Sequence, residues 1–512
     1  MTGTATLTWF ARHELTLAWR DWAAMMAGGR TTRERAVTLG ALGFVALLHW
    51  LAYAILSPQL REGFAIDKTT LVTLTASLLF TFSMMMSQAI EQVTRAFYAR
   101  ADLDLILSSP ASAPHLFAVR IAAIALTGMA MTGLLAAPII NVAAAIDGAH
   151  WLGAYALIAA MSAVATGLSV MAATALFQYA GAKRTRLIAQ IIAAVVGAAL
   201  VIGIQICAVL YYGNLSRFEV LRSAAVLNAA PGETSLVWLP AHALLGDSGA
   251  VLALLIGSLA FLAAVIATYA PHFATHAIAA AGVSEHTSSQ TQTSRAFRAK
   301  PAMQALRAKE WTLLRRDPWL VSQSLMQVLY LIPPALLCWH DMGAGTEVHT
   351  ILAPVLVMAF GQLSGGLAWL AISGEDASDL IATAPLNRRA VTRAKTEAVL
   401  MAVAFPAAPL ILALTFASLW GAAVTALGIA LAAASAVAIQ LWFRTSTTTR
   451  SQFRRRQTAS KASTFAEAFS SIFWAAATGF AAAQSWFAIA FVVLAMITLA
   501  AARFISPQGA AA

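Results

Sequence analysis

Two stretches of the chain place an acidic residue, a proline and a basic residue at the same spacing. Each begins Asp-Leu-Ile, with a proline six positions after the aspartate and a basic residue ten positions after the proline. The shared residues are Asp104, Leu105, Pro110 and Arg120 in the first stretch, and Asp379, Leu380, Pro385 and Lys395 in the second. A proline ends or redirects a helix, and a long basic side chain anchors a helix at a membrane interface. The pattern predicts a short surface helix and not a catalytic centre; a plain connecting loop is the alternative.

A second pair of charged markers precedes the two stretches in the same order. The sequence Glu-x-x-x-x-x-Arg-Asp occurs once before each of them. Its residues are Glu14, Arg20 and Asp21 in the first copy, and Glu310, Arg316 and Asp317 in the second. Because two markers recur in one order, each before a run of apolar segments, we interpret the chain as an internal duplication. Each copy of this second marker is expected to lie on an amphipathic helix in the headgroup plane.

The elements that must position these residues are long apolar helices. Hydrophobic residues make up 60% of the chain and charged residues 11%, well below the roughly 25% of a soluble protein. A membrane span needs roughly 20 apolar residues, and we expect twelve such segments. They are Val37–Ser57, Thr69–Ala89, Ile121–Ile146, Trp151–Ala180, Ile188–Tyr212, Ala250–Ala270, Leu320–His340, Thr350–Ser373, Ala398–Leu419, Gly421–Phe443, Ala468–Ala483 and Trp486–Ala502. The predicted fold is an all-α, polytopic integral membrane protein with two parallel six-helix repeats.

The distribution of positive charge supports this topology. With both termini in the cytoplasm, all but four of the 33 Lys and Arg residues lie on the cytoplasmic side, as the positive-inside rule requires. The four on the outer side are Arg61, Lys68, Arg217 and Arg222. The net charge of +11 is thereby explained by orientation and anionic lipid, without nucleic acid. We expect a multi-pass protein of the inner (plasma) membrane, with repeats at 1–285 and 301–512 and a polar cytoplasmic linker at 286–300.

Polar residues inside the predicted spans are few. No Asp, Glu, Lys or Arg is expected at mid-depth, which disfavours a proton- or sodium-coupled transporter. His49 and Asn141 are expected to form interhelical hydrogen bonds. Four glutamines are candidates for lining a transport path, although hydrogen bonding between helices is the commoner role: Gln88, Gln205, Gln362 and Gln440. No metal site is expected.

In architecture and motifs, the chain resembles the permease subunits of ABC-2-type exporters. The resemblance rests on an amphipathic entry helix, two spans, and an Asp-Leu-Ile stretch with a proline and a later basic residue. Such permeases usually have six helices, so this chain resembles two of them fused. The resemblance implies that Glu91–His115 and Glu375–Arg393 dock on ATPase subunits, one per half, with the entry helices beside them.

The chain contains no G-x-x-x-x-G-K-[ST] motif, the loop that cradles nucleotide phosphates. We therefore expect no enzymatic activity and no cofactor on this chain, with ATP bound by the partner subunit. The uncharged interior predicts a hydrophobic or amphiphilic substrate. A membrane scaffold or a membrane-embedded enzyme without an ATPase partner remains an alternative, and an ion-coupled secondary transporter is a more distant one.

Overall fold

The structure is a computed structural model, and the part of the chain that it describes consists of helices and their connections. It describes residues 34–62, 67–98, 113–213, 216–272, 301–316, 348–373, 383–443 and 461–506, with isolated positions at 12, 16, 329, 332–333, 336 and 381. No strand occurs in these ranges. The all-α prediction is confirmed for these residues.

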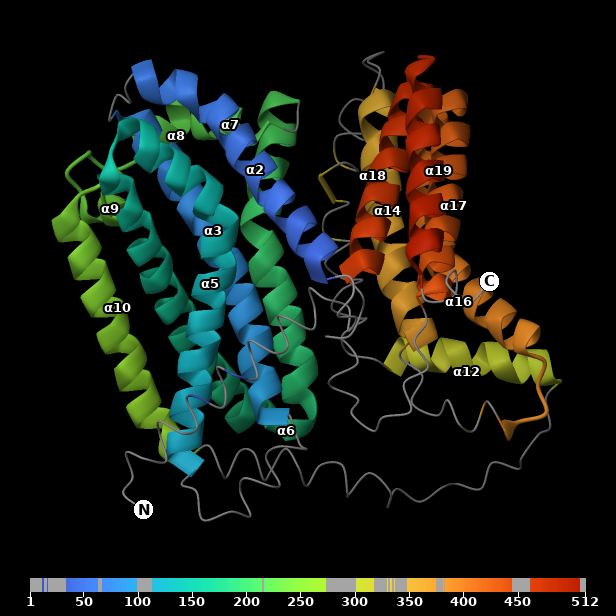
Figure 1. The fold of residues 1–512 in the computed structure, drawn as a ribbon, viewed down its shortest axis with the longest axis horizontal. Coiled ribbons are helices and arrows are strands. Elements are labelled where there is room, and N and C mark those ends of the chain that lie inside the picture. The colour runs from blue at the N-terminus through green and yellow to red at the C-terminus, as the bar shows by residue number, and fades with distance from the viewer. Residues whose placement is uncertain are drawn as a thin grey trace. The chain divides into compact units, whose positions relative to one another are not determined.

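The chain divides into two compact units, 1–201 with 217–290, and 202–216 with 291–512. The helices before the division at residue 290 are α2 (Glu34–Glu62), α3 (Lys68–Tyr98), α5 (Ala113–Asp147), η2 (Ala149–Leu152), α6 (Gly153–Tyr212), α7 (Arg217–Leu221), α8 (Ala224–Ala229), η3 (Leu236–Trp238), α9 (Leu239–Leu244), α10 (Ser248–Tyr269) and η4 (Ala270–His272). Those after it are α12 (Ala302–Arg316), α14 (Val348–Ser373), α16 (Arg388–Ala417), α17 (Leu419–Trp442), α18 (Lys461–Ala482) and α19 (Phe487–Ile505) (Figure 1). The predicted linker at 286–300 lies outside the described residues.

Nine helical segments in the described ranges are long and apolar enough to cross a membrane. They are α3, α5, the two parts of α6, α10, α14, α16, α17 and α19. Each coincides with one of the twelve predicted spans, and together they indicate a multi-pass membrane protein. Helices α2 and α18 cover the first and eleventh predicted spans but are not among the nine. The seventh predicted span, 320–340, lies almost entirely outside the described residues, so the count of twelve and the two-repeat arrangement stay predictions.

The break within α6 separates two of these spans. Gly181 has φ 70° and ψ 160°, a conformation that glycine adopts without the steric cost that a Cβ would bring. The basic sequence Lys183-Arg184 follows at once. The two predicted spans that end at Ala180 and begin at Ile188 are therefore joined by a break in the helix at Gly181, without a longer loop between them.

In the second unit, α14 and α18 run antiparallel in close contact along much of their length. A Cβ on Gly361 would lie 2.7 Å from Ser471 Oγ, and one on Gly365 would lie 2.6 Å from Glu467 Oε2. Farther along, a Cβ on Gly479 would lie 3.1 Å from Cγ of Pro354. Small residues at such positions let helix backbones approach closely inside a membrane. Both helices also pack against α17.

Helix α12 lies across the ends of α14 and α16 and contacts both (Figure 1). Among its described side chains, those of Leu306, Glu310 and Leu314 are buried. Their spacing of four places them on one face of the helix. Two of the three are leucines, which explains why this face packs on the bundle, and the third is a carboxylate that requires a partner there.

Candidate functional site

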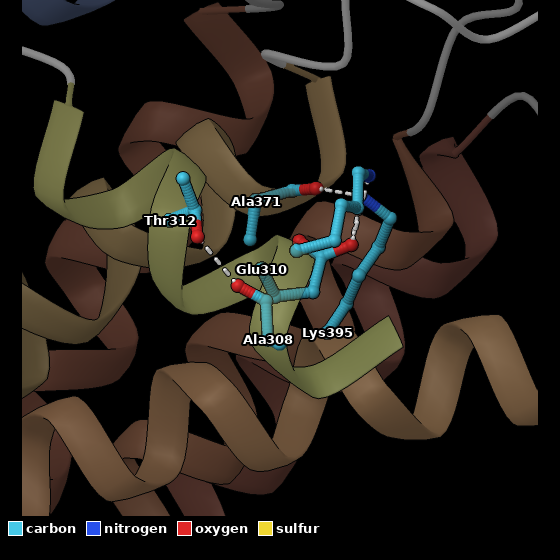
Figure 2. A network of polar contacts seen from close by, with 6 residues as sticks. Ala308, Glu310, Thr312, Ala371 and Lys395 are labelled. Atoms are coloured by element: carbon cyan, nitrogen blue, oxygen red, sulfur yellow. Dashed lines mark hydrogen bonds and ion pairs between the residues drawn. The ribbon is translucent and has the colours of Figure 1, made fainter. Parts of the chain in front are cut away.

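A buried ion pair joins three helices of the second unit where α12 crosses the bundle. Lys395 lies in the third turn of α16, and its side chain is 4% exposed. Its Nζ lies 3.3 Å from Oε1 of Glu310 on α12, whose side chain is fully buried. The same ammonium donates a hydrogen bond to the carbonyl oxygen of Ala371. Figure 2 shows the lysine reaching from its own helix to both acceptors. We call Glu310, Lys395 and Ala371 the charged joint.

The position of Ala371 helps to explain why a buried cation is favourable here. It lies in the last turn of α14, which ends at Ser373, where carbonyl groups lack partners within the helix. The negative end of the helix dipole also favours a cation at this place. Lys395 therefore neutralises two negative groups at once: the carboxylate of Glu310 and the carboxyl end of α14.

Glu310 has a second cationic neighbour and an unsatisfied oxygen. Lys309 Nζ lies 3.0 Å from Glu310 Oε1 and is partly exposed. Oε2 of Glu310 is buried and has no hydrogen-bond partner among the described residues. Removing one member of a buried ion pair costs about 3–5 kcal/mol, because the other charge stays desolvated and unpaired. The joint is therefore a contact that the protein cannot open without a large loss of stability.

A more exposed set of charges lies beside the joint on the same two helices. Glu397 on α16 accepts hydrogen bonds from Nε of Arg307 on α12 and from Nε of Arg393, both at 2.8 Å. The side chains of Arg307 and Arg393 are 45% and 71% exposed. Such exposed pairs contribute little to stability, because water screens them. They provide a second point of contact between α12 and α16, which restricts rotation of α12 about the joint.

The joint is continuous with the second Asp-Leu-Ile stretch. Leu306 of α12 belongs to one hydrophobic cluster with Val391 and Ala394 of α16, and Ile381 and Leu386 of the stretch pack against that cluster. Asn387 then accepts a hydrogen bond from the Arg389 backbone N–H at 2.9 Å and begins α16. Residues on both sides of Pro385 thus contact α12 directly or through α16.

The structure describes fewer than half of the predicted docking and entry-helix residues. Pro385 is exposed just before α16, Lys395 and Glu310 form the joint, and Arg120 is half-buried on α5. Arg316 is the last residue of α12, and its side chain is outside the described part. The others also lie outside it: Glu14, Arg20, Asp21, Asp104, Leu105, Pro110, Asp317, Asp379 and Leu380. Their assigned roles stay predictions.

The four candidate path glutamines differ in exposure and in their contacts. Gln88 on α3 and Gln362 on α14 are exposed, and Gln205 on α6 is half-buried. Gln440 on α17 is buried, and its side-chain amide donates a hydrogen bond to Oε1 of Glu467 on α18. The carboxylate of Glu467 lies at the level of Gly365, well inside α14. Glu467 stands directly before the predicted span that begins at Ala468 and so was not singled out among the residues inside the predicted spans.

The polar contacts in the first unit follow the expectation for interhelical hydrogen bonds. Asn141 on α5 lies with its Nδ2 3.3 Å from Nε2 of His49 on α2. Its Oδ1 accepts a 2.9 Å hydrogen bond from the hydroxyl of Tyr155 on α6. One asparagine thus connects three helices. This network explains His49 as a structural residue.

No group of three or more His, Cys, Asp or Glu side chains suited to a metal ion occurs in the part of the chain that the structure describes. Comparison with family models, with curated proteins and with solved structures finds no match. The functional inference therefore rests on this chain's own residues and their geometry.

Proposed function

We propose that this chain is the membrane-spanning permease subunit of an ATP-driven exporter, with both termini in the cytoplasm of a cell bounded by an inner membrane. A separate ATPase subunit docks on each half of the chain. The observation that supports this proposal best is the charged joint, because it links α12 and the second Asp-Leu-Ile stretch to the ends of two membrane helices.

The geometry suits the transmission of a mechanical displacement. Helix α14 ends at Ser373 and α16 begins at Arg388, so the stretch between them connects two candidate spans. A partner bound to this stretch would act on the end of α14, which Lys395 holds, and on α12, which Glu310 holds. Displacing it would therefore move α12, α14 and α16 as one body. The stretch that binds the partner would thus also transmit the partner's movement to the membrane helices.

The same arrangement is proposed for the first half, on the basis of the matched sequence. Arg120 lies near the beginning of α5, as Lys395 lies near the beginning of α16. The proposal includes twelve spans in two parallel repeats and two ATPase partners. The nucleotide would be bound by those partners, since this sequence has no phosphate-binding loop of the Walker A type.

The composition of the spans supports a hydrophobic or amphiphilic substrate. Helices α10 and α17 contain no charged residue, and α14 contains only His349 among ionisable residues. A hydrophilic solute or an ion would require convergent polar groups along its path. These three helices provide no acidic or basic residue apart from His349, so a lipid-like or peptide-like molecule is the substrate class that fits.

Affinity purification from the native host in a gentle detergent tests the proposal. We expect an ATPase subunit to co-purify in stoichiometric amount, and the pair of changes Asp104→Ala and Asp379→Ala to reduce its recovery without preventing membrane insertion. The matched control removes two acidic residues from the segment between the fifth and sixth predicted spans, which the predicted topology places outside the cell, by the changes Glu219→Ala and Glu233→Ala. It should leave recovery unchanged.

Absence of any ATPase subunit after chemical crosslinking would contradict the exporter proposal and favour a membrane scaffold or enzyme. Unchanged recovery with the Asp104 and Asp379 changes would leave the exporter proposal standing. It would, however, remove the docking role of the two stretches.

A further inference from the structure

Glu467 is a carboxylate at a close contact of three helices, and nothing in the proposed transport cycle accounts for it. Its Oε1 accepts a hydrogen bond from the side-chain amide of Gln440 on α17. Its Oε2 lies where a Cβ on Gly365 of α14 would come within 2.6 Å. The glycine leaves just enough room for the carboxyl group, which thus contacts α14 and α17 although the Glu467 residue as a whole is partly exposed.

Charge compensation for this carboxylate is absent among the described residues that face it. Helix α14 contains one ionisable residue, His349, whose ring packs against Gly421 at the other end of the helix. Helix α17 contains no ionisable residue. On α19 the one charged residue is Arg503, whose guanidinium lies 5.5 Å from the centre of the Trp442 ring. On α18 itself the other charged residue is Lys461, six residues before Glu467, whose side chain is outside the described part.

An ionised carboxylate without a cation is costly inside a helix bundle, whereas a neutral carboxyl group with an amide partner is not. A proton is the smallest ligand that removes this cost, and it needs no more space than the contact leaves. The geometry thus favours the protonated form whenever α18 is packed against α14.

We propose that Glu467 is a proton-binding site and that its proton holds α18 against α14 and α17. Loss of the proton would place a negative charge between two helices that approach through glycine, and would weaken their contact. This inference is independent of the proposed exporter function, because it concerns the packing of the second unit alone. Its test requires neither substrate nor ATPase partner.

The test compares the full-length wild type with the Glu467→Gln variant in lipid nanodiscs. Infrared difference spectroscopy detects the C=O stretch of a protonated carboxyl group directly. We expect wild type near neutral pH to show one such band that Glu467→Gln lacks. The control Glu233→Gln alters an exposed carboxylate and should leave the band in place.

Thermal unfolding gives a second measurement on the same variants. A carboxyl group that is protonated when folded and ionised when unfolded lowers stability progressively as the pH rises above its unfolded pKa. Glutamine resembles the neutral acid and does not titrate. We expect the melting temperature of Glu467→Gln to exceed that of wild type by a margin that widens from about pH 5 to about pH 8.

Two results would overturn the proposal. One is the absence of a protonated-carboxyl band specific to Glu467 near neutral pH, including the case in which a bound metal cation compensates an ionised group. The other is a melting-temperature difference between the two proteins that does not change with pH.

Discussion

At the scale of single residues, Glu310 and Lys395 neutralise each other's charge inside the protein, where water solvates neither of them. Changing Lys395 to Met leaves Glu310 buried beside the C-terminal carbonyls of α14, with the partly exposed Lys309 as its remaining described cation. We expect Lys395→Met to lower the free energy of unfolding by about 3–5 kcal/mol. Adding Glu310→Gln should restore much of this loss, because no buried charge is then left unpaired. Denaturant unfolding of the single and double variants in mixed micelles measures the coupling between them.

The exposed charges beside the joint offer the matched control. Arg393 forms an ion pair on the same helix but is 71% exposed, so Arg393→Ala should cost far less than Lys395→Met. Strictly additive effects of the Lys395 and Glu310 changes would show that the two residues are not coupled. The joint would then lose its role as the contact that connects α12 to α16.

The residues of the joint also show what the sequence could and could not predict. The repeated markers in the sequence singled out both Glu310 and Lys395, because each residue occupies a matched position in two copies. Their pairing was not predictable, since the two residues are far apart in sequence and meet only because α12 crosses the end of the bundle. Glu467 has no counterpart marker; its one signal was a glutamate directly before an apolar run.

At the scale of elements, the contact of α14 with α18 depends on which glycine faces the partner helix. A Cβ at Gly365 would lie 2.6 Å from Glu467 Oε2, whereas one at the adjacent Gly366 would meet nothing within 4 Å. We expect Gly365→Ala to displace the Glu467 carboxyl group, disturb its hydrogen bond with Gln440 and lower the melting temperature. Gly366→Ala should be neutral or stabilising, because alanine is the better helix former by about 1 kcal/mol. Thermal unfolding of the two variants in one detergent compares them directly.

Equal melting temperatures for these two variants would contradict a stabilising role for the contact of Glu467 with Gly365. The pair also isolates the contact from helix propensity, since both changes add the same methyl group to the same helix one residue apart. Sequence could predict that glycines allow close approach here. It could not tell which of the two neighbouring glycines faces α18, because that depends on the rotation of α14 in the bundle.

At the scale of the whole molecule, the nine apolar segments found in the described ranges were predictable from hydropathy, and α18 shows where hydropathy is insufficient. Its polar residues Ser463, Ser470, Ser471 and Thr478 are buried against neighbouring helices. Its exposed large side chains are apolar: Phe465, Phe469, Ile472 and Phe480. The mean hydropathy of the helix is lowered by polar residues that face neighbouring helices and not lipid. A helix packed lengthwise against the candidate span α14 is expected to cross the membrane with it.

Cysteine labelling tests whether α18 spans. In a chain whose Cys207 and Cys338 are replaced by serine, one cysteine is introduced at Gln304, exposed on α12, or at Ala483, exposed in the turn after α18. The predicted topology places five spans between these positions, so they should lie on opposite sides of the membrane. A membrane-impermeant maleimide should label Ala483→Cys on intact cells and Gln304→Cys only after permeabilisation. If α18 did not cross, four spans would separate the two sites and both would react from the same side. That single result would exclude the twelve-helix arrangement and leave the second half with five predicted spans.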